Sequence, residues 1–305
     1  MNPRYRPLSV WTLLFVGVMG PARPDSLPSM APVTGADSVL VVAPHPDDES
    51  LCCGGLIHMA REAGARVTIV WITNGDGFRW DAMVTHHVLF PSATVYRSLA
   101  STRADEARAA ARSLDVPADS LYFLGYPDQG VAALMGAYYH SVMPWRSSYT
   151  QATSVIYPGA FDPGAVYEGE RLAADFGAIL DRVKPTLVLA PSVRDSHPDH
   201  RGAALLTIRV LGERGELGAL RNWIVHGGSG WPQGGFEPEL PQTVAPLGAG
   251  LHWTELQLDT ASVAAKLQAI TAHHSQMLVM AHTMRRYVRS TELYAQPDQP
   301  GTPAR

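Results

Sequence analysis

Two short clusters of histidine and carboxylate side chains stand out in this chain as residues whose types and spacing could do chemistry. The first is the run Ala43-Pro44-His45-Pro46-Asp47-Asp48-Glu49, and the second is His197-Pro198-Asp199-His200. Each cluster follows an apolar stretch that is typical of a buried strand. Two strand ends that each carry His and Asp could together form one metal site.

Two imidazole nitrogens and one carboxylate oxygen form a ligand set that leaves a position open for water, which is typical of catalytic zinc. Bound zinc lowers the pKa of that water to about 7, so a nucleophile is available at neutral pH. A second carboxylate beside the water can take its proton and pass it to the leaving group. Asp47 and Asp48 can divide these roles, although their spacing alone does not say which one is the ligand. A remaining histidine could donate a hydrogen bond to the developing oxyanion.

Each cluster has a simpler explanation when it is taken alone. Asp47, Asp48 and Glu49 could cap the free N–H groups of a helix and interact with its dipole. The segment from His197 to His200 could be a solvated turn. The occurrence of both clusters, each at a predicted strand end, favours the metal site over these two explanations.

The clusters need a sheet to position them, and the apolar pattern of the chain predicts one. Short runs rich in Val, Ile and Leu, without clean alternation, indicate strands that are buried on both faces of a parallel sheet. These predicted strands are Ser38–Ala43, Arg66–Thr73, Ser120–Leu124, Thr186–Ala190 and Asn222–His226. The helical patterns between them are Glu49–Ala63, Thr102–Leu114, Glu168–Val183 and Arg201–Glu213. This alternation predicts an α/β fold of the Rossmann-like class, a mostly parallel sheet with helices on both faces.

A strand order of 3-2-1-4-5 would make the first and fourth predicted strands neighbours. The two clusters would then face each other across the point where the strand order reverses, which is where ligands bind in open α/β sheets. Further along, Thr254–Asp259 is predicted as an edge strand and Thr260–Gln276 as a closing helix. The long connections 125–164 and 227–250 are expected to rim a pocket.

The N-terminal segment is predicted to be separate from this fold. Arg4 and Arg6 precede an uncharged stretch over 8–20 and then small residues and Pro, which is typical of a secretory signal peptide. The stretch is shorter than the roughly 20 apolar residues that span a bilayer, so we expect no transmembrane span in the mature protein. We therefore predict a signal peptide and Pro-rich lead (1–31), a single domain (33–295), a disordered tail (296–305) and export to the periplasm or the cell exterior.

The composition excludes some functions. A hydrophobic content of 46% and a charged content of 17% are typical of a globular protein. A net charge of −4 argues against nucleic-acid binding, which needs a basic face. Cys52 and Cys53 are adjacent in a predicted helix, so their side chains should point to different faces. We expect them to be poor disulfide partners and small buried apolar residues.

Taken together, the two clusters resemble the signature motifs of the PIG-L (LmbE-like) zinc-dependent N-deacetylases. The resemblance covers roughly residues 38–276 and extends to four further segments. They are Thr73-Asn74-Gly75-Asp76-Gly77, Arg103-x-x-Glu106, Leu124-Gly125-Tyr126-Pro127-Asp128 and His273-x-Ser275-Gln276.

The resemblance implies a role for each member of the clusters. His45, Asp48 and His200 would bind Zn²⁺, or another divalent metal such as Fe²⁺. Asp47 would be the general base, and His197 would stabilise the tetrahedral intermediate.

The remaining implied roles concern positioning and substrate contact. Asp199 would orient or tune His197, and Arg103 and Asp128 would contact substrate hydroxyls. The substrate would be an N-acetylated amino sugar of the GlcNAc type, in a glycan, glycoconjugate or glycolipid. From the residues alone, Arg103 could instead pair with Glu106 on a helix surface, and Asp128 could start a turn.

Two other functions use part of the same pattern. Non-haem Fe(II) oxygenases also hold iron with two His and one carboxylate, although their sites usually lie in β folds. A catalytically inactive sugar-binding module is the non-enzymatic alternative. Binding alone does not need a free base, so the presence of Asp47 beside the predicted ligands argues against that module.

Overall fold

The structure is a computed structural model that describes residues 27–297. Residues 1–26 of the predicted signal peptide and Pro-rich lead (1–31) and most of the predicted tail (296–305) lie outside this range. Within it, residues 28–30 run along the edge of the domain, where Met30 N–H donates to Glu255 O and Glu255 N–H donates to Pro28 O, both at 2.8 Å.

A seven-stranded sheet, in the order β3-β2-β1-β4-β5-β7-β6, forms the centre of the described chain. Its strands are β1 (Ser38–Ala43), β2 (Arg66–Thr73), β3 (Leu121–Tyr126), β4 (Leu187–Pro191), β5 (Leu220–Trp223), β6 (Trp253–Gln257) and β7 (Thr291–Ala295). β1 to β5 pair in parallel, and β7 is antiparallel to both of its neighbours. The predicted α/β class, the order 3-2-1-4-5 and the edge position of β6 are confirmed.

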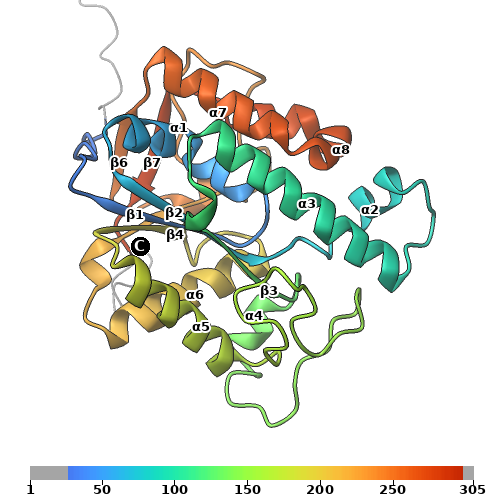
Figure 1. The fold of residues 1–305 in the computed structure, drawn as a ribbon. Coiled ribbons are helices and arrows are strands. Elements are labelled where there is room, and N and C mark those ends of the chain that lie inside the picture. The colour runs from blue at the N-terminus through green and yellow to red at the C-terminus, as the bar shows by residue number, and fades with distance from the viewer. Residues whose placement is uncertain (1–26, 298–305) are drawn as a thin grey trace, which may run out of the picture.

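Helices cover both faces of the sheet (Figure 1). One face carries α1 (Asp48–Glu62), α3 (Ala93–Ser113), α7 (Thr260–Ala272) and α8 (His274–Arg285), and the short α2 (Arg79–Thr85) packs beside α3 and α8. The other face carries α4 (Val131–Leu134), α5 (Gly169–Val183) and α6 (Pro198–Glu213). Side chains of β1 alternate between the two layers, with Val39 and Val41 in one hydrophobic cluster and Leu40 and Val42 in the other.

Several elements differ from the prediction, among them α2 and α4, which were not predicted, and β5, which ends at Trp223. The helix predicted over Thr102–Leu114 begins earlier, because Ser92 caps it by accepting the N–H of Val95 at 3.4 Å. The helix predicted over Thr260–Gln276 is two helices that meet at His273. Strand β7 was missed. Its sequence contains the charged Glu292, which is buried because Lys266 Nζ pairs with it at 2.7 Å and other groups donate hydrogen bonds to it.

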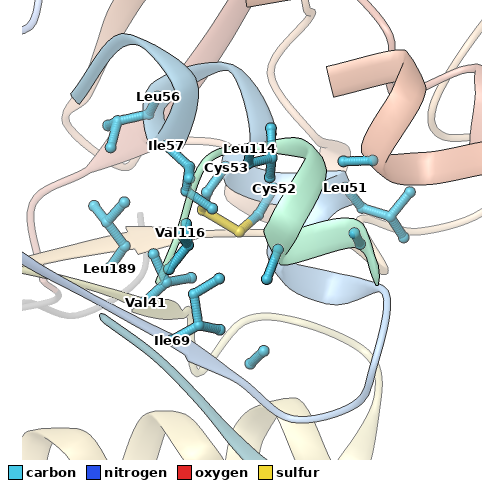
Figure 2. Close-up of a cluster of buried hydrophobic side chains, with 14 of the residues drawn as sticks. Val41, Leu51, Cys52, Cys53, Leu56, Ile57, Ile69, Leu114, Val116 and Leu189 are labelled. Atoms are coloured by element: carbon cyan, nitrogen blue, oxygen red, sulfur yellow. A yellow bond between two sulfur atoms is a disulfide. The ribbon is translucent and has the colours of Figure 1, made fainter. Parts of the chain in front are cut away.

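The prediction that Cys52 and Cys53 are not disulfide partners is wrong. The two residues are joined by a disulfide, and both are buried as predicted, among Val41, Leu51 and other apolar side chains (Figure 2). The prediction rested on the different directions in which adjacent side chains leave a helix. Beside the cysteine pair, the N–H groups of Gly55 and Leu56 donate to the Glu292 carboxylate of β7, each at 2.8 Å.

In the range 27–297, no helix is both long enough and apolar enough to cross a membrane.

Candidate active site

The two clusters meet at the carboxyl ends of two neighbouring strands. β1 leads through Pro44 to Asp47 into α1, and β4 leads through a short loop into α6. β1 and β4 pair in parallel, so the loops that follow them lie at the same edge of the sheet. His45 Nε2 lies 3.2 Å from Asp199 Oδ2, which joins the first cluster directly to the second.

The carboxylate of Asp48 lies between two imidazoles. Asp48 Oδ2 is 3.2 Å from His45 Nδ1 and also 3.2 Å from His200 Nε2. Apart from this contact with Asp48, the buried His200 Nε2 makes no hydrogen bond within the described residues. A buried ring nitrogen without a well-aligned hydrogen bond is costly unless a ligand such as a metal ion completes its coordination. The nitrogen and oxygen donors here suit Zn²⁺ or Fe²⁺, so the residues fit a divalent metal.

The second ring nitrogen of each histidine is held by another carboxylate. His45 Nε2 contacts Asp199, and His200 Nδ1 lies 3.1 Å from Asp195 Oδ2. Asp195 Oδ2 also accepts the backbone N–H groups of Val225 and His226, at 3.0 and 2.9 Å. Carboxylates in this position fix the tautomer and ring orientation of metal-binding histidines. Nδ1 of His45 and Nε2 of His200 are thereby turned toward Asp48.

Three sets of side chains in the described range place one ligand atom each within 4.8 Å of one another. They are His45 with His197 and His200, Asp48 with His200 and His226, and His45 with Asp128 and Asp199. The trio His45, Asp48 and His200 is not itself one of these compact sets. His226, which is exposed, was missed because no motif surrounds it, although the predicted fifth strand ended there and so brought it to the same edge.

Asp47 occupies a strained position beside the predicted ligands. It is the residue before α1 and has φ 132° and ψ −32°, a conformation that costs a non-glycine residue about 1–3 kcal/mol. Its Oδ2 lies 3.3 Å from Arg103 Nη2. Burial and the neighbouring Asp48 carboxylate raise the pKa of Asp47 to about 7, although Arg103 opposes the shift. A carboxylate with this pKa is suited to proton transfer near neutral pH.

A buried hydrogen-bond network centred on Glu49 holds the strained backbone of Asp47. Glu49 Oε2 accepts the N–H of Asp47 at 3.1 Å and the indole N–H of Trp71 at 2.8 Å. Its Oε1 accepts the Ser50 hydroxyl at 2.8 Å and lies 2.9 Å from His273 Nε2. The sequence places His273 in a family-like segment but does not indicate this contact with Glu49.

Arg103 donates hydrogen bonds to the loops that follow β1 and β2. Its Nη2 donates to Pro46 O at 2.8 Å, and its Nη1 donates to Gly75 O at 2.9 Å. A Cβ on Gly75 would lie 2.2 Å from Arg103 Nη1, so the close approach needs glycine there. Arg103 does not pair with Glu106, whose carboxylate instead accepts the N–H and the hydroxyl of Ser275 at 2.8 and 2.7 Å.

Asp128 and Asp199 both contact His45. Asp128 Oδ1 lies 3.4 Å from His45 Nε2, and its Oδ2 accepts the N–H of Gly77 at 2.8 Å. Burial raises the pKa of Asp128, but His45 and Arg103 outweigh it and hold the pKa well below the usual range. The Asp199 carboxylate orients His45, a different partner from the His197 that the resemblance implied.

His197 is held in its neutral form. Burial and the nearby rings of His45 and His200 lower the pKa of His197 to about 3. Its Nδ1 accepts the N–H of Asp199 at 3.2 Å, and its Nε2 lies 3.4 Å from Gln129 Nε2. His197 lines the site cavity, as do His45, Asp47, Asp48, Arg103 and Asp128. This cavity has a volume of about 400 Å³.

A buried histidine–carboxylate centre lies at the switch point of a Rossmann-like sheet, with a further carboxylate beside it, and this arrangement suits hydrolysis with a divalent metal. The family model for PIG-L, described as GlcNAc-PI de-N-acetylase, matches residues 40–211. The chain belongs to this family. It is accordingly an N-deacetylase, a hydrolase of amide bonds.

One curated relative is named as a deacetylase, and two solved structures share the fold. A 1D-myo-inositol 2-acetamido-2-deoxy-alpha-D-glucopyranoside deacetylase from Kineococcus radiotolerans is 27% identical, covering 89% of this chain and 77% of the relative. The crystal structure of an antimicrobial pseudoaglycone deacetylase shares the fold, with a TM-score of 0.55, 19% identity and coverage of 85% of this chain and 96% of that one. The zinc-inhibited form of a teicoplanin deacetylase has a TM-score of 0.53, 18% identity and coverage of 84% and 96%.

Proposed function

We propose that the protein removes an N-acetyl group from an N-acetylated amino sugar of the GlcNAc type with the help of one divalent metal ion, Zn²⁺ or Fe²⁺. The observation that carries this proposal is Asp48 Oδ2, which lies 3.2 Å from His45 Nδ1 and 3.2 Å from His200 Nε2, a buried nitrogen that makes no hydrogen bond to any other group among residues 27–297. The deacetylase named for the Kineococcus relative, whose substrate is an acetamido sugar, supports the substrate class.

His45, Asp48 and His200 hold the metal in this proposal. When bound, the ion would polarise the acyl carbonyl and lower the pKa of the attacking water. Exposed His226 is a neighbour of the centre and not one of its three ligands.

Asp47 performs the proton transfers. It takes a proton from the attacking water and delivers it to the nitrogen of the leaving amine, so that acetate and a free amine result. Arg103 lies 3.3 Å from its carboxylate and keeps it directed toward the cavity. His197 donates its Nε2 proton to the oxygen that gains charge during the attack.

Asp128 is the proposed contact for a sugar hydroxyl, because its buried carboxylate lines the cavity. Both terminal nitrogens of Arg103 donate to loop carbonyls. We therefore assign Arg103 to positioning Asp47 and not to binding the sugar. We also propose, from the N-terminal sequence, that the protein is exported and meets its substrate outside the cytoplasm.

The test is acetate release from a panel of N-acetylated sugars and glycans, before and after chelation. Release that stops with chelator and returns on adding back Zn²⁺ or Fe²⁺ is the expected result. Release that persists in chelator would refute the metal mechanism. Metal-dependent oxygen uptake without acetate would favour the oxygenase alternative.

A further inference from the structure

One wall of the site cavity is apolar. Leu51, Val225, Trp231, Met280 and Tyr287 line the cavity and also belong to, or pack against, a single hydrophobic cluster. The rings of Trp231 and Tyr287 contact each other at 5.6 Å between centroids. We call these five side chains the apolar wall.

The two aromatic residues of the apolar wall have no free polar atom to present to a ligand. The Tyr287 hydroxyl donates to Val225 O at 2.6 Å, and the Trp231 indole N–H donates to Thr243 O at 3.3 Å. Both polar groups are therefore occupied within the protein. A hydroxylated ligand group placed against this wall would lose its hydrogen bonds to water and gain none.

The apolar wall begins next to the general base. Leu51 lies one turn after Asp47 on α1, and its N–H donates to Asp47 O at 3.0 Å. Polar residues line another part of the cavity, where Asp128, Gln129 and His197 come from the loops after β3 and β4. The cavity thus has a polar part and an apolar part, and the predicted reacting centre adjoins both.

The reacting carbonyl carbon of an amide carries two substituents, the amine half and the acyl half. Sugar hydroxyls on the amine half need the polar part, which leaves the acyl half for the apolar wall. We propose, resting on the proposed function, that the site prefers N-acyl groups longer than acetyl, whose hydrocarbon chain packs on Leu51, Trp231, Met280 and Tyr287. The substrate class would then be N-acylated amino sugars with a short aliphatic chain.

The test compares N-acetyl-, N-butanoyl- and N-hexanoylglucosamine by the rate of amine release with the metal-loaded full chain. Burial of one methylene is worth about 0.8 kcal/mol, or about fourfold in kcat/KM. Allowing for incomplete burial, we expect about a tenfold rise from acetyl to butanoyl. Calorimetric binding of the same compounds to the Asp47→Asn variant should show the same order without any turnover.

Met280→Trp should fill the apolar part and abolish the preference for longer chains, and Met280→Ala should weaken it. Leu278→Trp is the matched control, because Leu278 lies on the same helix with 68% of its surface exposed. Thermal unfolding establishes that each variant is folded.

Equal or falling kcat/KM and affinity from acetyl to butanoyl would overturn the inference while leaving the deacetylase proposal intact. A preference for butanoyl that survives both Met280 variants would also overturn it, because the chain would then lie elsewhere. Failure of the proposed function looks different, since no compound would release amine. The binding series would still decide whether the apolar wall selects chain length.

Discussion

Replacing Glu49 should remove the hydrogen bond that holds the backbone of Asp47, the proposed general base. Glu49 accepts hydrogen bonds from Asp47 N–H, Ser50 and Trp71 and pairs with His273, all in the buried interior. Glu49→Ala leaves these groups unpaired, and loss of one partner of a buried charged pair costs about 3–5 kcal/mol. At about 2–4 °C per kcal/mol for a domain of this size, the melting temperature should fall by about 10 °C.

The effect on catalysis should exceed the effect on substrate binding. Without the Glu49 acceptor, the strained backbone of Asp47 at φ 132° can relax and move the carboxylate. A misplacement of about 1 Å can cost about 100-fold in rate, so we expect kcat to fall by about that factor with little change in KM. Glu49→Gln keeps an acceptor for the Asp47 N–H and should recover most of kcat.

Steady-state kinetics, metal analysis and thermal unfolding together form the assay. Glu62→Ala is the matched control, because Glu62 is an exposed carboxylate at the other end of α1. A folded Glu49→Ala protein with kcat within threefold of the wild type would refute the reasoning. So would a Glu49→Gln variant as impaired as Glu49→Ala.

Three further predictions concern the groups around the centre. Asp195→Asn should weaken metal affinity by about 10–100-fold, because Asp195 holds His200 Nδ1, and metal titration of the apoprotein checks this. Gly75→Ala should displace Arg103 and lower kcat without removing the metal, whereas unchanged kinetics would show that the contact is dispensable. Burial lowers the pKa of His273, but Glu49 outweighs it, so the folded-state pKa is raised. Its stabilising contribution is therefore complete below the unfolded value of about 6.5 and is lost as pH rises through the folded pKa. His273→Gln should flatten that part of the stability–pH curve measured by thermal unfolding, and a curve parallel to the wild type would contradict the assignment.

The parallel part of the sheet was predictable because β1, β2 and β4 are buried on both faces and are therefore continuously apolar. The two clusters follow β1 and β4 directly, so the strand order alone brings them together. β7 was not predictable in this way, because Glu292 interrupts its apolar pattern and Lys266, which neutralises it, is distant in sequence.

Several contacts of the site were not predictable either, because the partners are distant in sequence. Arg103 donates to the backbone carbonyls of Gly75 and Pro46. Glu106 accepts from Ser275, so neither contact follows from the spacing of the two residues on α3. The disulfide between Cys52 and Cys53 was not predicted, because adjacent side chains on a helix are expected to point to different faces.

In the proposed mechanism, Asp48 binds the metal while the adjacent Asp47 stays free to move the proton. Metal content and acetate release, measured in parallel for Asp47→Asn and Asp48→Asn, separate these two roles. We expect Asp47→Asn to keep the metal and lose turnover by about 100-fold or more, and Asp48→Asn to lose the metal itself. Metal loss in Asp47→Asn, with the metal retained in Asp48→Asn, would reverse the assignment of the two carboxylates.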